Sequence, residues 1–350
     1  MNPLENHAIV RGSLSDASSS VQDLCASKHI PVLKEEVLAC FAPLEDLQPG
    51  RPLRFLDGTL GLGGHSEAIL TAHPGCRLLG LDRDTEALSL ACARLAPFGE
   101  RFRSAHCTFS SLISALDAAG WDRVDGALID IGVSSMQLDE GERGFSVHSD
   151  GPLDMRMDPQ SSSPSARDLV NTWDQKKLRD AIASLGEDPL ADRIARAICQ
   201  ARERAPITTT GALAAIVEGA YPPAWRAKAR HHPATRTFQA LRMTVNDELG
   251  ELSRFLDDIL PRLSVGGRLC VITFHSLEDR MVKQRMRSWS QGCQCPPHVT
   301  VCRCHHVPEV RLLSKKPLTA NDAELAANPR ASSAKLRACE KLCDWKGGGL

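Results

Sequence analysis

The sequence predicts an α/β protein: a doubly wound sheet with an inserted all-helical domain. From about residue 51 to 150, short apolar runs that end in acids alternate with helical patterns. A Pro/Ser-rich stretch, DGPLDMRMDPQSSSPSARD, then breaks this rhythm, and the strand pattern returns only with GGRLCVITF at 266–274. Repeated β-α units of this length predict a parallel sheet with helices on both faces.

The first part of the chain contains four expected strands, LRFLD, RLLGLDRD, RFRSAHC and VDGALIDIG. Between them lie three helical patterns, HSEAILTAH, TEALSLACARL and FSSLISALDAAG. Thr85 is expected to cap the second helix and Gly120 to close the third. From Asp168 to about Tyr221 apolar residues recur at helical spacing, as Ile194 and Ile198 do. Near the end, SAKLRACEK is expected to form a final edge strand.

Composition and charge narrow the class of protein. The chain has 350 residues and no run of eighteen apolar residues, which argues against a membrane span. The N-terminus lacks a basic start and an apolar segment, so no secretory signal is expected and the interpretation is a cytoplasmic protein. The segment 193–242 holds nine Lys/Arg and two Asp/Glu, a net charge of +7 in a chain whose net charge is −1. This charge predicts a phosphate-binding face, and a solvated helix surface is the alternative. Its candidates are Arg226, Lys228, Arg230, Arg236 and Arg242.

A glycine-rich loop, FLDGTLGLGGHS, follows the first expected strand. A nucleoside triphosphate is disfavoured, because Gly64 is followed by His65 and not by the lysine of a P-loop. A dinucleotide is disfavoured, because Ser66 stands where the last fingerprint glycine belongs. Asp82 lies 21 residues after Gly61, where a carboxylate accepts hydrogen bonds from an adenosine ribose. The pattern therefore favours S-adenosylmethionine; the alternative is that the glycines serve packing alone and Asp82 caps a helix.

Four blocks of the sequence resemble the RsmH/MraW family of S-adenosylmethionine-dependent methyltransferases of small-subunit ribosomal RNA. They are HIPVLKEEVL with FLDGTLGLGGHS, LIDIGVSSMQLDEGERGFSVHSDGPLDMRMDP, HHPATRTFQALRMTVNDELGEL and GGRLCVITFHSLEDRMVK. The resemblance covers residues 29 to about 342. It implies methylation of the exocyclic N4 of a cytidine in the decoding region of 16S rRNA, in an assembled or nearly assembled small subunit.

The resemblance also implies a Rossmann-like methyltransferase domain with a helical insertion, in agreement with the break in the pattern, and it implies the cofactor contacts. We expect the methyltransferase domain at 29–150 and 236–342 and a helical RNA-substrate domain at 151–235. The polar, Ser-rich residues 1–28 are expected to form a disordered extension, and 343–350 a tail, both outside the resemblance. Asp82 would hold the ribose of S-adenosyl-L-methionine, and Phe109 would pack on its adenine. The full set of implied cofactor contacts is Gly63, Gly64, His65, Asp82, Phe109, Asp130 and Gln137.

The acceptor for the proton of the target amine is not identified by a motif. The Asp/Asn-Pro-Pro-aromatic motif of many amino methyltransferases is absent, because the fourth strand leads into DIGVSS. Asp130 is the first candidate, either for the cofactor's positive end or for the target amine. Other polar groups expected at strand ends are Ser134, Ser135, His275 and Glu278. For His275, a packed histidine at the end of a strand is an equally good interpretation.

The sequence also contains a cluster of four cysteines that could bind a metal. CQCPPHVTVCRCHH spaces Cys293, Cys295, Cys302 and Cys304 as C-x-C-x6-C-x-C. Four thiolates can enclose Zn²⁺, but C-x-C is tight for two ligands of one metal, so we expect no metal.

Two other functions of the whole protein remain as alternatives. One is methylation of DNA or a small molecule, and the other is a role in ribosome assembly without catalysis.

Overall fold

The computed structural model describes residues 30–47, 49–134, 136–137, 140–229, 231–293, 295, 301 and 306–344. The chain falls into two units. The first comprises Met1–Gly132 and Glu251–Leu350, and the second comprises Val133–Gly250. The expected N-terminal extension and residues 345–350 of the expected tail lie outside the described residues.

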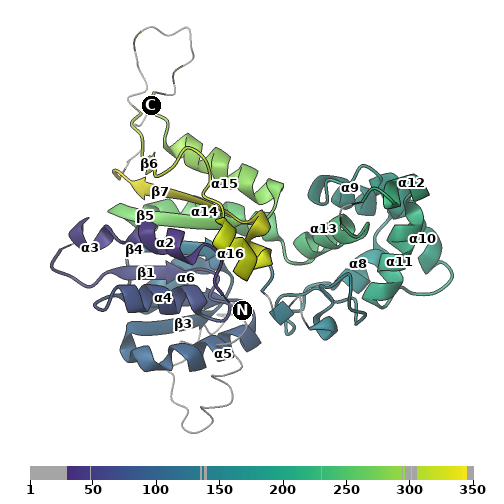
Figure 1. Ribbon diagram of the computed structural model, residues 1–350, viewed down its shortest axis with the longest axis horizontal. Coiled ribbons are helices and arrows are strands. Elements are labelled where there is room, and N and C mark those ends of the chain that lie inside the picture. Colours follow the sequence, from purple (N-terminus) through teal and green to yellow (C-terminus); the bar gives the residue numbers. More distant parts are fainter. Residues whose placement is uncertain are drawn as a thin grey trace, which may run out of the picture. The chain divides into compact units, whose positions relative to one another are not determined.

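A seven-stranded sheet forms the centre of the first unit (Figure 1). Its strand order is β3-β2-β1-β4-β5-β7-β6. The strands from β3 to β5 are parallel to one another, whereas β7 is antiparallel to both β5 and β6. From β1 the chain adds β2 and β3 on one side, and it then returns to add β4 and β5 on the other side of β1. Open α/β sheets bind ligands at such a reversal of strand order, here between β1 and β4. The strands are β1 (Arg54–Asp57), β2 (Arg77–Asp82), β3 (Phe102–His106), β4 (Val124–Asp130), β5 (Leu263–Thr273), β6 (Val310–Leu312) and β7 (Lys335–Lys341).

Helices cover both faces of this sheet, as the sequence predicts. In β4, Ala127 and Ile129 belong to one apolar cluster and Leu128 to the other, because successive side chains of a strand point to opposite faces. The first cluster includes residues of α6 (Leu112–Ala119), α14 (Glu248–Arg262) and α15 (Ser276–Trp289). The second includes residues of α2 (Lys34–Phe41), α3 (Leu44–Leu47), α4 (Gly64–Ala72) and α5 (Thr85–Leu95). A short helix, α16 (Asp322–Ala327), precedes the last strand.

Two helix ends test the expected caps. Gly120 closes α6 with a φ angle of 72°, as expected. The prediction that Thr85 caps α5 is wrong, because Thr85 is the first helical residue and Asp84 is the cap. The Asp84 carboxylate accepts hydrogen bonds from the backbone N–H groups of Glu86 and Ala87. A carboxylate satisfies these free donors and also meets the positive end of the helix dipole.

The prediction of a final edge strand at the end of the chain is also wrong. SAKLRACEK does supply a strand, β7, but β7 lies inside the sheet between β5 and β6. The edge is formed by β6, which has only three residues and pairs with β7 through Val310, Arg311 and Leu312. A strand of three residues shows no alternation of apolar and polar residues, so its sequence gave no signal.

The second unit is helical and has its own core. Side chains cap three of its helices: Ser165 caps α8, Asp174 caps α9 and Thr209 caps α11. The unit is wider than the expected insertion 151–235, since it begins at Val133 and ends at Gly250. Its helices within the described residues are α8 (Ala166–Thr172), α9 (Gln175–Leu185), α10 (Ala191–Arg202), α11 (Thr210–Ala220), α12 (Pro223–Arg226) and α13 (Thr235–Val245). The described part of the chain also contains 3₁₀ turns at Ala96–Arg101, Phe109–Ser111 and Pro329–Ser333 in the first unit, and at Gly141–Arg143 in the second.

Among the described helices, none is both long enough and apolar enough to cross a membrane.

Candidate active site

The glycine loop connects β1 to the first turn of α4. Gly61 and Gly63 have φ angles of 51° and 78°, which favour residues without a β carbon. A β carbon on Gly64 would lie 2.6 Å from Cγ of Pro31. A β carbon on Gly63 would lie 3.1 Å from Cδ1 of Leu95. Close packing therefore requires both glycines, and the loop ends at the free N–H groups of a helix N-terminus, which suit a polar ligand.

Asp82 lies at the end of β2 and holds the glycine loop. Its Oδ2 accepts a hydrogen bond from the backbone N–H of Gly61 at 2.7 Å. Its Oδ1 accepts one from the backbone N–H of Asp84 at 2.8 Å. Burial raises the pKa of the Asp82 carboxyl to about 6, although these two N–H groups act to lower it. Each oxygen has a second lone pair, so the carboxylate retains acceptor capacity for a ligand.

His65 and Asp130 face each other where α4 begins and β4 ends. Nε2 of His65 lies 3.7 Å from Oδ2 of Asp130. Among the described residues, neither Nε2 of His65 nor Oδ1 of Asp130 has a hydrogen-bond partner, and both atoms are buried. The backbone N–H of Asp130 donates to Oγ1 of Thr59 at 2.6 Å, which ties the end of β4 to the glycine loop. Buried polar atoms without partners are costly, so these two atoms are candidates for contact with a ligand.

Phe109 begins the 3₁₀ turn that follows β3 and is half-buried. Its ring meets that of Phe255 edge to face, with centroids 5.7 Å apart. A β carbon on Gly58 would lie 3.0 Å from Cβ of Phe109, so this residue stands beside the start of the glycine loop. The structure thus brings together six of the predicted contacts at the carboxyl ends of β1, β2, β3 and β4: Gly63, Gly64, His65, Asp82, Phe109 and Asp130.

Gln137 belongs to the second unit and is not part of this group. It is buried, and its side-chain Oε1 accepts a hydrogen bond from the backbone N–H of Ser134 at 3.1 Å. The Oγ of Ser134 in turn accepts one from the backbone N–H of Gln137 at 3.2 Å. These two bonds order the turn after β4. Ser135 lies outside the described residues.

Asp57 is a further buried acid beside the glycine loop, and the sequence analysis did not assign it a role. It ends β1 and is fully buried. Its carboxylate accepts hydrogen bonds from Oγ of Ser66 at 2.7 Å and from the backbone N–H of Thr59 at 3.2 Å. Burial raises the pKa of the Asp57 carboxyl, against the effects of Ser66 and of the nearby His65. The signal was available, because an acid directly after a buried strand is unusual without a role in shaping the loop.

His275 and Glu278 lie at the carboxyl end of β5, the neighbour of β4. Nε2 of His275 lies 2.8 Å from Oε1 of Glu278, and Glu278 is 1% exposed. The other oxygen of Glu278 accepts hydrogen bonds from the backbone N–H groups of Phe274 at 3.0 Å and His275 at 3.3 Å. A capping glutamate therefore begins α15 and places a carboxylate oxygen beside the imidazole.

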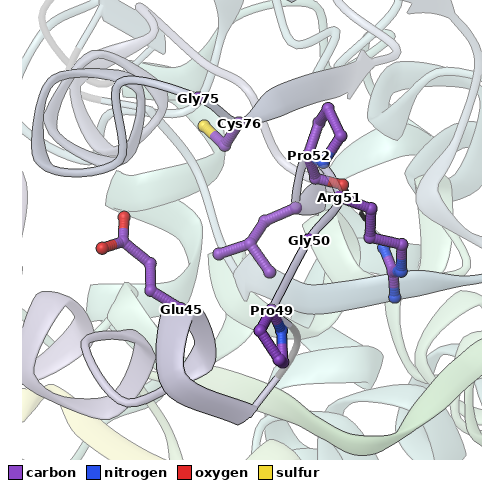
Figure 2. A pocket seen from close by; sticks show the side chains of 8 residues that line it. Glu45, Pro49, Gly50, Arg51, Pro52, Gly75 and Cys76 are labelled. Carbon is purple, nitrogen blue, oxygen red and sulfur yellow. Dashed lines mark hydrogen bonds between the residues drawn. The ribbon is translucent and has the colours of Figure 1, made fainter.

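A separate pocket lies at the opposite ends of the strands, the amino ends of β1 and β2. Its volume is about 380 Å³, and it lies between the segment before β1 and the segment before β2 (Figure 2). Amino ends of parallel strands are not where such sheets bind ligands, so we do not assign the pocket to the cofactor. It is lined by Glu45, Pro49, Gly50, Arg51, Pro52, Leu53, Gly75 and Cys76.

The cysteine cluster lies partly outside the described residues, because Cys302 and Cys304 do. Of the other two, the Sγ of Cys293 accepts a hydrogen bond from the backbone N–H of Cys295 at 3.4 Å. Nothing in the described part of the chain tests the expected absence of zinc.

Comparison with known proteins identifies the family. A sequence model described as the MraW methylase family matches residues 26–342. The chain belongs to this family. A protein of Desulfovibrio desulfuricans named ribosomal RNA small subunit methyltransferase H is 62% identical over 92% of this chain and 96% of its own. Proteins with the same name from Nitratidesulfovibrio vulgaris and Lawsonia intracellularis are 64% and 53% identical, and each alignment covers 90% of this chain and at least 95% of the relative.

A member of the MraW methylase family is an S-adenosylmethionine-dependent methyltransferase, and the residues present here fit that cofactor. Asp82 offers acceptors for ribose hydroxyls, and Phe109 offers a ring for a base. The buried, unpartnered Oδ1 of Asp130 offers an acceptor for a cationic group. The loop has no lysine for a phosphate, which agrees with an adenosine that carries none.

Proposed function

We propose that this methyltransferase transfers a methyl group from S-adenosyl-L-methionine to the exocyclic N4 of a cytidine in the decoding region of small-subunit ribosomal RNA. The observation that carries the proposal is the match of nearly the whole chain, residues 26–342, to the MraW methylase family. The relatives that are 53–64% identical share a name that specifies the small ribosomal subunit as the source of the RNA.

The cofactor is proposed to bind at the carboxyl ends of β1 to β4. Gly63 and Gly64 would let the loop approach the ligand, and His65 would stand in the first turn of α4. Asp82 would accept hydrogen bonds from both ribose hydroxyls, as two lone pairs of its oxygens remain unused by the backbone. Phe109 would stack on the adenine.

The remaining two contacts are proposed for the methionine end of the cofactor. Asp130 would face the positive end, because its Oδ1 is buried without a partner among the described residues. Gln137, in the second unit, is kept as a proposed contact on the family resemblance alone. The bound sulfonium supplies an activated methyl group, so this chain's task is mainly to align the amine with it and to exclude water.

The helical unit is proposed to deliver the RNA. Arg226 and Lys228 are exposed and lie next to the half-exposed Trp225, and Arg226 lies 4.0 Å from the carboxylate of Glu218. Arg236 is exposed and donates to the carbonyl of Glu187 at 2.9 Å. Exposed cations suit phosphates, and an aromatic ring beside them suits an unstacked base.

The other two basic candidates contribute less to this argument. Arg242 forms two hydrogen bonds to the carboxylate of Glu248, at 2.7 and 2.9 Å, so its charge is largely neutralised. Arg230 lies outside the described residues. The proposed substrate is the RNA within an assembled or nearly assembled small subunit, which places the reaction in the cytoplasm.

Mass spectrometry of ribosomal RNA nucleosides tests the proposal. Small subunits from cells without this protein are incubated with the purified protein and methyl-labelled S-adenosylmethionine. We expect one labelled cytidine per subunit, modified at N4, and no label on naked DNA. Label on another base or another atom would contradict the proposed specificity, and absence of label with intact cofactor binding would favour an assembly role.

A further inference from the structure

We propose that His275 accepts the proton that the target amine must lose, and that Glu278 positions it for this task. The proposal rests on the proposed methylation of an exocyclic amine and adds the acceptor for that reaction. It starts from a chemical need: an amine nitrogen that forms a new bond to carbon carries one proton too many until a base removes it.

The place of His275 in the sheet is the first argument. β4 and β5 are parallel neighbours, and Asp130 pairs with Ile272 in their register. The backbone N–H of Ile131 donates to the carbonyl of Ile272 at 3.0 Å, so the two strands end together. Three residues later, His275 stands at the same edge of the sheet as Asp130. The cofactor contacts occupy β1 to β4, so the side of β5 is left for the group that approaches the methyl.

A contact beyond the strands supports this placement. The backbone of Gly132, just after β4, passes close to the side chain of Phe274, because a β carbon there would lie 3.5 Å from Cδ2. The residue before His275 therefore lies against the loop that leaves Asp130. The side chain of His275 is 13% exposed, so its ring is largely shielded from bulk water.

The second argument is the arrangement around the imidazole. Glu278 Oε1 lies 2.8 Å from Nε2 of His275, whereas Glu278 Oε2 is held by two backbone N–H groups. The contact has ion-pair distance without hydrogen-bond geometry, because Nε2, Nδ1 and Oε1 are all buried atoms that lack a hydrogen-bond partner among the described residues. A carboxylate oxygen at 2.8 Å still favours a proton on Nε2, and the lone pair that a proton acceptor needs would then be on Nδ1.

The third argument is the rigidity of the support. Asp279, the residue after Glu278, receives two hydrogen bonds from Arg337 of β7, at 2.7 and 3.1 Å. The first turn of α15 is thereby fixed to the sheet, and with it the carboxylate that orients His275. Such a supporting contact is what a positioned base requires.

The proton balance is simple. The N4–H bond breaks and its electron pair stays on nitrogen, while a new N–H bond forms at Nδ1 of His275. The resulting imidazolium is stabilised by the adjacent Glu278 carboxylate. When the product leaves, the proton passes to water, and no other reactant is consumed.

The chain offers a matched control at the opposite edge of the sheet. His73 is also buried, and its Nδ1 lies 2.9 Å from Oε1 of Glu45. Its other ring nitrogen, Nε2, is buried without a hydrogen-bond partner among the described residues. His73 precedes β2, on the amino side of the strands, so the same chemistry stands away from the site. Burial alone therefore does not mark a base, and position does.

The test measures single-turnover methyl transfer to unmodified small subunits with the cofactor in excess. We expect His275→Asn to slow transfer by at least about a hundredfold and His73→Asn to change it by less than about threefold. Cofactor affinity should stay within about threefold in both variants. Free imidazole should restore part of the rate in His275→Ala and none in His73→Ala.

A second readout keeps the test decisive if His275→Asn fails to fold. ¹⁵N NMR of histidine-labelled wild-type protein, with His275 assigned by a substitution that does fold, should show Nδ1 unprotonated and Nε2 protonated. Glu278→Gln should weaken that preference and slow transfer. A protonated Nδ1 in the wild type, or a folded His275→Asn that transfers within about threefold of the wild-type rate, would overturn the proposal. Wild-type protein that methylates no cytidine N4 would instead refute the proposed function, and the NMR result would stand by itself.

Discussion

In the sheet of the first unit, buried charged groups at the amino ends of the parallel strands have different surroundings from those at the carboxyl ends, which we call the amino edge and the carboxyl edge. At the amino edge, the fully buried Asp125 accepts two hydrogen bonds from Arg51, at 2.5 and 2.8 Å, and one from the backbone N–H of Arg54 at 2.9 Å. At the carboxyl edge, Asp130 and His65 keep buried polar atoms that have no partner within the described part of the chain.

This difference separates stability from function. At the amino ends of the strands, the buried Asp125 carboxylate is paired within the protein, although Nε2 of His73 there also lacks a hydrogen-bond partner among the described residues. At the carboxyl ends, we propose that a ligand supplies the missing partners of Asp130 and His65. Substitutions at the amino edge should therefore lower the free energy of unfolding, and substitutions at the carboxyl edge should lower affinity.

The largest effect is expected from Arg51→Ala. The variant leaves the buried Asp125 carboxylate with one backbone donor, so the free energy of unfolding should fall by about 2 kcal/mol. Cofactor affinity in the folded protein should not change. Urea denaturation measures the first quantity and calorimetric titration the second.

The control for Arg51→Ala is Arg123→Ala, whose partner Asp344 is exposed. Exposed pairs contribute little, so a loss below about 0.5 kcal/mol is expected. Equal losses in the two variants would show that the pairing of Asp125 does not distinguish the amino edge.

At the carboxyl edge, Asp82→Ala should weaken S-adenosylmethionine binding by more than about tenfold. The substitution removes acceptors for two ribose hydroxyls, which corresponds to about 1.4 kcal/mol or more. Isothermal titration calorimetry measures the affinity, and Asp82→Asn, which keeps one acceptor oxygen, should lie between the two proteins. Unchanged affinity in Asp82→Ala would remove this residue from the site.

The pH dependence of binding sharpens the same point. Because burial raises the pKa of Asp82 to about 6, the carboxylate is mostly ionised at pH 7 and mostly protonated at pH 5. A protonated carboxyl is a poorer acceptor, so affinity should fall on the order of tenfold between these two pH values. Asp82→Asn should show a flatter profile.

Unfolding of the protein at low pH does not explain the expected decline in cofactor affinity. A carboxyl with a raised pKa in the folded state favours folding at low pH, and this contribution is lost as the pH rises through about 6. Asp82 thus acts on stability and on affinity in opposite directions. A thermal-melting series over the same pH range separates the two, and a wild-type affinity that stays constant would argue against ribose hydroxyls at this carboxylate.

The smallest effect is expected from Thr59→Val. The backbone N–H of Asp130 loses its bond to the Thr59 hydroxyl, which should cost about 1 kcal/mol of folding free energy. The shift of the β4 end should weaken cofactor binding a few-fold. Thr59→Ser keeps the hydroxyl and should behave as wild type in both denaturation and titration, so a defect in the serine variant would point to packing of the methyl group instead.

The apolar runs in the sequence, and the acidic residues that end them, predicted most of the strands of the sheet. The apolar runs before Asp57, Asp82 and Asp130 became β1, β2 and β4, because fully buried parallel strands are almost continuously apolar. The two errors in the fold have local causes. β6 is too short to carry a pattern, and the choice between Asp84 and Thr85 as helix cap depends on one backbone angle.

The sequence predicted the part of the candidate site that depends on where each strand ends and on the parallel direction of the strands. Glycines, Asp82 and Asp130 follow strands, so their meeting at one edge follows from parallel pairing. The role of Asp57 in the loop and the link between Thr59 and Asp130 depend on side-chain contacts across strands. The pairing of His275 with Glu278 spans one helical turn, yet its relevance appears only when β5 is placed beside β4.

The position of β7 has a consequence for how the protein is made. This strand is formed by 335–341 and pairs with β5 along six residues. Until the ribosome has released that segment, β5 presents a row of unpaired backbone groups, the kind of edge at which nascent chains associate wrongly. A premature stop before Lys335 should thus yield insoluble material even though every proposed cofactor contact has already been synthesised.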